Sequence, residues 1–198
     1  MIMNTRRYLV LILCLIATSF VNAKEGFIQL DGTEINIQLQ KELAPISKTF
    51  PEFFLSVSYE VKSSTLPLEF YAPVNDLLLF LNGKQTTLER IIGLSISKEF
   101  VAGEISHKDF SKFRKMLSTQ INESKPGTKV LFDNTNSIGY RTIVKDSKQR
   151  VKAQSFALIK GKLLELEVSA VYKTEEDLRW ANETLNEVVS ILTNLNRK

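Results

Sequence analysis

Few side chains in this sequence have the chemistry needed for catalysis. His107 is the only histidine, so a Ser-His-Asp or Cys-His arrangement would have to use it as the base. It follows Ser106, which the pattern places at the start of a helix, and Lys108 comes next, so the position is typical of an exposed residue. The Gly93-Leu94-Ser95 stretch lacks the closing glycine of a nucleophile elbow. We therefore expect no nucleophilic catalysis.

Glu165 and Glu167 are the strongest candidates for acid and base chemistry. They alternate with leucines, so strand geometry places both carboxylates on one face about 7 Å apart. Paired carboxylates at such a distance can act together. The solvated face of an amphipathic strand explains the same pattern, and this is the interpretation we adopt. The sequence therefore predicts no catalytic residue and no enzyme.

A metal or cofactor site is not expected either. Zinc sites need clustered cysteine and histidine, and these residue types are nearly absent. Residues 133–137 (DNTNS) resemble the start of a calcium loop, but the glycine comes one place late and the bidentate glutamate is missing. We interpret this stretch as a hairpin turn. No glycine-rich phosphate loop is present.

Binding to another protein is the function for which the sequence offers candidate residues. Trp180 lies beside the apolar stripe of a C-terminal helix, next to Thr184 and Ile191, so the apolar face is wider than one sheet needs. Either a loop covers this flank, or it is an exposed patch for a partner. A second candidate is the polar face of another helix, which is either simply solvated or docks an acidic partner or lipid headgroups. Its candidate residues are Lys108, Lys112 and Lys115, and Arg114 is grouped with them on the same solvated face.

The C-terminal third contains the elements that are easiest to predict. Residues 151–159 and 164–172 are two strands joined by a turn at Lys160-Gly161-Lys162, where glycine suits a tight hairpin. Thr174 followed by Asp177 predicts the start of a helix. Apolar residues then recur every three or four positions and form one stripe: Leu178, Ala181, Leu185, Val188, Leu192 and Leu195.

Further strands and one more helix are predicted upstream. Asp31-Gly32 predicts a hairpin between residues 27–30 and 34–39. Ser106 and Asp109 predict the start of a helix that ends before Pro126-Gly127. Other strands are expected from alternation or apolar runs, at residues 53–61, 68–71, 77–81, 88–100, 130–132 and 138–144.

The N-terminus has the features of an export signal. Two arginines precede an apolar run over residues 8–16, and the sequence before Ala23 has the small-residue pattern of a signal peptidase site. The run is too short for a membrane span. Leu13 before Cys14 does not fit a lipoprotein signal. We predict that residues 1–23 are a signal peptide cleaved after Ala23, with an uncleaved N-terminal anchor as the alternative.

Cleavage would leave 175 residues, enough for one domain with its own core. It would remove the only cysteine, so the exported protein would have no disulfide, which favours a bacterial periplasm. It would also remove two arginines and lower the formal net charge from +4 to +2. Such a charge does not favour nucleic acid as a partner.

The order of elements in the second half resembles that of the PsbP-like superfamily. The similar parts are the helix over residues 106–123, the connector 125–130, the strand with Gly139-Tyr140, the hairpin at Lys160-Gly161-Lys162 and the final helix with Trp180. The resemblance covers about the last 95 residues. It implies a small exported or lumenal α+β protein with an antiparallel sheet between helical layers, and a role in binding or assembling other proteins.

We therefore predict a single α+β domain over residues 24–198, with an antiparallel sheet and two main amphipathic helices packed on it as an α/β/α sandwich. The expected function is that of a periplasmic, non-enzymatic protein-binding or assembly accessory. Two alternatives remain open. One is a carrier that encloses a hydrophobic small molecule with the aromatic residues of its N-terminal half, namely Phe50, Phe53, Phe54, Phe70, Tyr71 and Phe80. The other is a periplasmic immunity protein against a secreted toxin.

Overall fold

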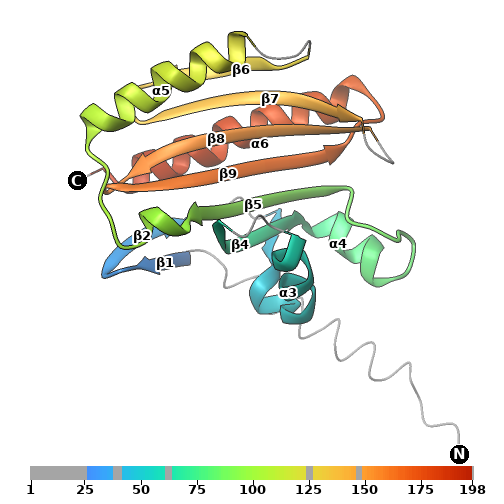
Figure 1. The fold of residues 1–198 in the computed structure, drawn as a ribbon. Coiled ribbons are helices and arrows are strands. Elements are labelled where there is room, and N and C mark those ends of the chain that lie inside the picture. The colour runs from blue at the N-terminus through green and yellow to red at the C-terminus, as the bar shows by residue number, and fades with distance from the viewer. Residues whose placement is uncertain (1–25, 38–41, 61–63, 124–126, 146–148, 198) are drawn as a thin grey trace, which may run out of the picture.

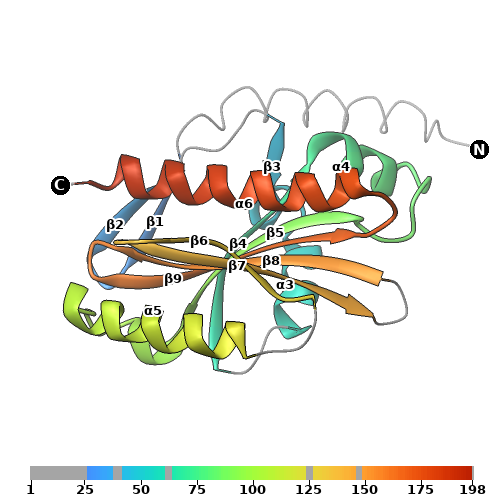
Figure 2. The ribbon, with the colours of Figure 1, turned by 90° about the horizontal axis from the view of Figure 1, so that it is seen from above.

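A computed structural model describes residues 26–37, 42–60, 64–123, 127–145 and 149–197. The predicted signal peptide, residues 1–23, lies outside these ranges. Within them, helices cover both faces of an antiparallel sheet (Figures 1 and 2). The fold is therefore α+β, as predicted.

The main sheet has seven strands in the order β3-β4-β5-β9-β8-β7-β6. A separate hairpin pairs β1 (Gly26–Leu30) with β2 (Thr33–Ile37), and its turn places Asp31 and Gly32 at φ of 44° and 77°. The predicted Asp31-Gly32 hairpin is confirmed. The strands of the main sheet are β3 (Leu43–Pro45), β4 (Thr65–Pro73), β5 (Arg90–Ser97), β6 (Lys129–Asn134), β7 (Ser137–Lys145), β8 (Gln149–Ile159) and β9 (Lys162–Val171).

The helices are distributed over both sides of the main sheet. The longest helix, α6, covers one face, and α5 and α3 lie on the opposite side (Figure 2). We call these two sides the α6 face and the α5 face. The helices are α2 (Ile46–Thr49), α3 (Pro51–Glu60), α4 (Val74–Leu81), the 3-10 helix η1 (Lys98–Phe100), α5 (His107–Asn122) and α6 (Glu175–Leu195).

The predicted C-terminal hairpin and helix are confirmed. Ile159 pairs with Lys162 across the turn between β8 and β9, and Lys160 and Gly161 have φ of 48° and 78°. Helix α6 begins after Thr174 with a capping box: Asp177 Oδ2 accepts a hydrogen bond from the backbone N of Thr174 at 3.1 Å. Such a box satisfies amide groups that the first helical turn leaves free.

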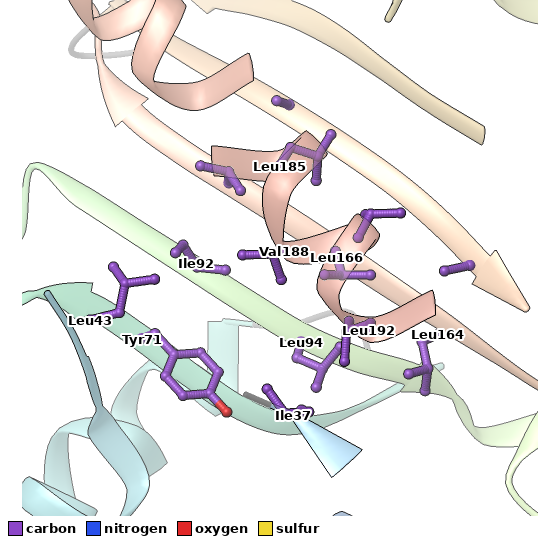
Figure 3. Packing of buried hydrophobic residues seen from close by; sticks show 14 of the residues in the cluster. Ile37, Leu43, Tyr71, Ile92, Leu94, Leu164, Leu166, Leu185, Val188 and Leu192 are labelled. Atoms are coloured by element: carbon purple, nitrogen blue, oxygen red, sulfur yellow. The ribbon is translucent and has the colours of Figure 1, made fainter. Parts of the chain in front are cut away.

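The main core fills the space between α6 and the sheet. Leu185, Val188 and Leu192 of α6 point towards leucines and isoleucines of β5 and β9 (Figure 3). Because strand side chains alternate between faces, Leu164 and Leu166 lie in this core while Glu165 and Glu167 lie on the α5 face. Ala181, Leu185, Val188 and Leu192 of the predicted stripe are buried, and Leu178 is half-buried against the same core. Its last member, Leu195, is exposed.

The strand predicted over residues 53–61 is wrong, because residues 51–60 form helix α3. Pro51 occupies the first helical position, which tolerates its missing N–H, and Glu52 follows in the first turn. Phe50, Phe53 and Phe54 all pack against a smaller core beside β4. The spacing of these three phenylalanines is helical, and their packing outweighs the alternation of small polar residues further on.

The strand predicted over residues 77–81 is also wrong, because residues 74–81 form helix α4. Pro73 precedes its first residue, and Leu77 is buried in the smaller core. Asn82-Gly83 ends this helix instead of forming a hairpin. Gly83 has a φ of 67°, and its N donates to Phe80 O at 3.0 Å, as glycines do at helix ends.

The remaining described elements agree with the predictions. Helix α5 is followed by four antiparallel strands and then by α6, which is the predicted order. The strand expected over residues 88–100 is β5, followed by the turn of η1. The short strand expected over 68–71 is the middle of the longer β4.

Candidate partner-binding surface

Helix α5 begins with a capped first turn and packs on the sheet through an aromatic side. Ser106 Oγ accepts from the backbone N of Asp109 at 3.1 Å and donates to Asp109 Oδ2 at 2.7 Å. Phe110 is fully buried in a third cluster with Leu158 and Leu163 of the main sheet. These contacts determine which side of α5 faces solvent.

Arg114 contributes to this attachment. Its guanidinium donates to Asp133 Oδ1 and to Asn134 O at the end of β6, and it lies 5.8 Å from the centre of the Phe110 ring. Only 17% of its side chain is exposed. The sequence pattern grouped Arg114 with the solvated lysines. That grouping is corrected, because the arginine joins α5 to the end of β6.

The three candidate lysines of α5 do lie on one exposed surface. Lys108, Lys112 and Lys115 are all exposed, and at about 100° per residue they fall within an arc of roughly 60°. Met116 beside them is 54% exposed. We call these four residues the lysine row.

Asp109 is the acidic residue in contact with this row. Lys112 Nζ lies 3.1 Å from Asp109 Oδ1, with both groups largely exposed. The hydrogen bond from Ser106, followed by the bond and charge of Lys112, lowers the pKa of Asp109 below its ordinary value. An exposed pair of this kind contributes little to stability. Lys108 and Lys115 add two further positive charges to the same surface.

Trp180 of α6 is covered by a side chain from the sheet. It packs against the main core and is half-buried. The Arg90 guanidinium of β5 lies 5.1 Å from the centre of its ring, a cation–π distance. Arg90 Nη2 also lies 3.0 Å from Asp177 Oδ1. A strand side chain, and not the expected loop, therefore covers this flank of α6.

Asp177, at the start of α6, binds both Arg90 and the backbone that leads into the helix. Burial raises the pKa of its carboxyl, but the bonds from Arg90 and from the backbone N of Lys173 and Thr174 outweigh burial and lower it. Sequence analysis assigned Asp177 only to the capping box. Its partner Arg90 was missed because the two residues are 87 positions apart.

The other two α6 candidates do not form one patch with Trp180. Thr184 is buried, with 6% of its surface exposed, so the structure removes it from the accessible surface. Ile191 is half-buried beside a hollow of about 620 Å³ on the outer side of α6. The described lining of this hollow comes from α6 alone. The α6 candidates and the lysine row lie on opposite sides of the sheet (Figure 2).

The two glutamates of β9 lie on the α5 face, as the alternation predicts. Glu167 Oε1 lies 3.0 Å from Lys152 Nζ, and Glu167 Oε2 accepts from Gln154 Nε2 at 2.9 Å. Burial, together with the charges of Glu165 and Glu167, raises the pKa of the nearby Tyr140 phenol. These contacts join neighbouring strands, which is the behaviour expected of a polar sheet face.

The aromatic residues of the N-terminal half do not surround one space. Phe53 packs on Phe80 and Phe54 packs on Phe70, each with ring centres 5.5 Å apart. Tyr71 points to the other face of the sheet and belongs to the main core (Figure 3). The rings therefore fill two separate cores.

The sequence predicts that residues 133–137 form a hairpin turn and not a calcium loop. They contain the turn that connects β6 to β7. Asn134 Oδ1 accepts from the backbone N of Asn136 at 3.1 Å and from the backbone N of Ser137 at 2.9 Å, which is an Asx turn. The described residues contain no group of three acidic, histidine or cysteine side chains that could hold a metal. They also contain no helix long and apolar enough to cross a membrane.

A cavity of about 470 Å³ lies at the end of the sheet where α5 begins, β8 turns into β9 and α6 ends. Figure 1 shows these three points at the same end of the molecule. We call it the end cavity. Its lining includes His107, Asn136, Leu158, Ile159, Lys160 and Arg197. The sequence pattern does not group these residues, because they come from elements and turns that are far apart in the chain.

Comparisons with known proteins do not assign this chain to a family. No protein family matches the sequence, and no curated protein is similar to it. Among solved structures, the fold is similar to the Ran-binding protein Mog1p of Saccharomyces cerevisiae, with a TM-score of 0.39 and 9% identity over 86% of this chain and 93% of that chain. At this TM-score the likeness carries no argument about function. The resemblance to the PsbP-like superfamily stays a prediction.

Proposed function

We propose that this protein is a non-enzymatic accessory of the bacterial periplasm that binds another protein through the lysine row of α5. The observation that carries the proposal is the alignment of Lys108, Lys112 and Lys115 on the solvent side of a helix whose other side is held by Phe110 and Arg114. A rigid helix loses little freedom when it binds, which favours association.

The chemistry of the row indicates the kind of partner. Positive side chains gathered on one surface attract a surface of opposite charge and speed the encounter. Met116 adds an exposed, adaptable apolar side chain next to the lysines. The partner is therefore a protein with an acidic surface and an apolar contact beside it. Trp180 is not assigned to the main contact with the partner, because Arg90 already covers its ring.

Site-specific cross-linking in living cells tests the proposal. A photoreactive amino acid at position 112 is expected to capture one discrete polypeptide of the envelope, which mass spectrometry then identifies. The same amino acid at Ser190, which is exposed on α6 on the opposite side of the sheet, is the matched control. Capture at both positions alike, or at Ser190 only, would contradict the assignment to α5.

The export component is tested separately by the mass of the protein purified from its own envelope. A mature chain that begins at Lys24 is expected, because the pattern before it is that of a signal peptidase site. A mass that still includes Met1 would overturn the periplasmic assignment. This outcome leaves the cross-linking result intact, so the two components are judged independently.

A further inference from the structure

We propose that the end cavity binds the C-terminal carboxylate of the partner polypeptide, together with its last amide N–H and an apolar terminal side chain. This inference rests on the proposed function and names the part of the partner that this site would recognise. It is carried by the chemistry of the cavity lining, which combines positive charge, an unsatisfied acceptor and apolar residues.

The first feature is positive charge from separate elements. Lys160 lies in the turn between β8 and β9, and Arg197 follows the end of α6. No aspartate or glutamate is among the described residues that line the cavity. Lys160 Nζ donates to Glu34 O at 2.7 Å, which fixes its position and leaves two of its three N–H groups for an anion. The arginine fork matches a carboxylate.

The second feature is an acceptor without a donor. Asn136 Oδ1 is buried and has no hydrogen-bond partner among the described residues. The backbone around it is fixed, because Asn136 O accepts from Leu158 N at 2.8 Å and Asn136 N donates to Asn134 Oδ1 at 3.1 Å. Buried polar atoms usually have a partner. A ligand that carries an N–H group beside its carboxylate would supply the donor, and a phosphate would not.

The third feature is an apolar share of the lining, from two adjacent residues of β8 that lie on opposite faces of the sheet. Leu158 and Ile159 line the cavity and are 5% and 3% exposed. The volume of about 470 Å³ is within the range of ligand pockets and larger than a carboxylate alone needs. A peptide end offers the carboxylate, the N–H and an apolar side chain together, and capture of a C-terminal carboxylate is a known mode of peptide recognition.

The cavity also adjoins the lysine row. His107 lines the cavity, and Lys108 begins the row on the same helical turn. A partner whose last residue enters the cavity would therefore place its preceding acidic residues beside α5. This continuity is why we assign the carboxylate to a polypeptide and not to a free small molecule.

Titration of the full mature protein, followed by amide NMR shifts, tests the inference. The probes are an acetylated hexapeptide of sequence DEDGAL with a free carboxylate, the same peptide with a C-terminal amide, and N-acetyl-leucine. The free-acid hexapeptide is expected to shift the amides of His107, Asn136 and Arg197. The amidated peptide is expected to bind at least tenfold more weakly, because it lacks the charge that Lys160 and Arg197 attract.

Variants separate binding from folding. Arg197→Gln is expected to weaken the binding of the free-acid peptide about tenfold, whereas Lys84→Gln, which changes an exposed lysine in the connection between α4 and β5, is expected to have no effect. Asn136→Ala is expected to weaken the peptide without lowering the thermal unfolding midpoint, because the atom that it removes has no partner in the described residues. A lower midpoint without weaker binding would contradict the role of Asn136.

The remaining outcomes are also decisive. Equal binding of the free-acid and amidated peptides, shifts confined to other residues, or no shift at the solubility limit would overturn the inference. Binding of N-acetyl-leucine as tight as that of the hexapeptide would assign the site to a free small carboxylate and overturn the polypeptide source. These probes need no natural partner, and N-acetyl-leucine does not reach Lys112. Failure here is therefore distinguishable from failure of the cross-linking test.

Discussion

The side chain of Asn196 binds both backbone polar groups of Asn36, a residue 160 positions earlier in the chain. Asn196 Oδ1 accepts from Asn36 N at 3.0 Å, and Asn196 Nδ2 donates to Asn36 O at 2.9 Å. The amide thus acts as a strand partner for β2. A third bond joins Nδ2 to Leu192 O. Helix α6 therefore ends by fastening the N-terminal hairpin to the main fold.

Asn196→Ala is expected to reduce the free energy of unfolding by about 1–3 kcal/mol, because it leaves backbone groups of Asn36 and Leu192 without their partner. Urea unfolding measures this change. Asn194→Ala, which loses only an exposed bond to Ser190 Oγ, is the control and is expected to stay within about 0.5 kcal/mol. Equal losses in the two variants would show that the hairpin is held by other contacts.

Gly139→Ala is expected to destabilise the protein by about 1–3 kcal/mol, as overpacking usually does. A Cβ at this position would lie 2.3 Å from Cζ of Phe132 on the neighbouring strand. The aromatic ring lies on the glycine and covers it, so the two residues pack as one unit. Thermal unfolding measures the change.

The control for this variant is Gly103→Ala, where the nearest atom to an added Cβ is Glu99 O at 3.9 Å. It is expected to leave stability nearly unchanged. A double variant that combines Gly139→Ala with Phe132→Leu should recover part of the loss from Gly139→Ala alone, because the smaller side chain makes room. A purely additive double variant would contradict the contact.

The stability of the protein is expected to depend on pH through the ionisation of Asp177. Its pKa is lower in the folded protein than the ordinary value of 3.8, so the unfolded chain takes up this proton first as pH falls. The stabilisation by this carboxylate is therefore present above about pH 4 and is lost as pH falls through the folded pKa.

Asp177→Asn removes this contribution. The difference in unfolding free energy between wild type and Asp177→Asn is expected to be largest at neutral pH and to shrink as pH falls below about 4. Urea titrations across this range measure it. A difference that stays constant over the whole range would mean that the Arg90 ion pair and the backbone bonds do not stabilise the ionised carboxylate.

The elements that could be predicted from the sequence are those whose signals are local. The Asp31-Gly32 and Lys160-Gly161 turns require positive φ, and both adopt it. The caps Ser106 and Thr174 each bond to residues within three positions. Such signals depend only on neighbouring residues, so they hold whatever the rest of the chain does.

The errors arose where two periodicities fit the same residues. The run after Pro51 contains alternating apolar residues, but its phenylalanines are also spaced for a helix that packs on Phe70 and Phe80. The apolar run of residues 77–81 suits a buried strand or a buried helix equally. Pro73 and Asn82-Gly83 are helix boundary signals there, and they indicate the correct structure when both are considered.

The candidate site was predictable only in part. The spacing of Lys108, Lys112 and Lys115 predicts a shared surface, and the structure confirms that they are exposed together. The sequence pattern does not predict that Arg114 binds Asp133, or that Arg90 covers the ring of Trp180. These contacts depend on the tertiary fold. The end cavity was missed for the same reason.

The affinity of the cross-linked partner, measured with purified proteins, tests the central claim most directly. The variant carries Lys108→Glu, Lys112→Glu and Lys115→Glu, which reverse the charge of the row without touching the buried side of α5. We predict that it binds the partner at least tenfold more weakly than wild type, with the same unfolding midpoint. We also predict that wild-type affinity falls as salt increases, because exposed charges are screened. Unchanged affinity in the variant, at any salt concentration, would contradict the claim that this protein binds its partner through α5.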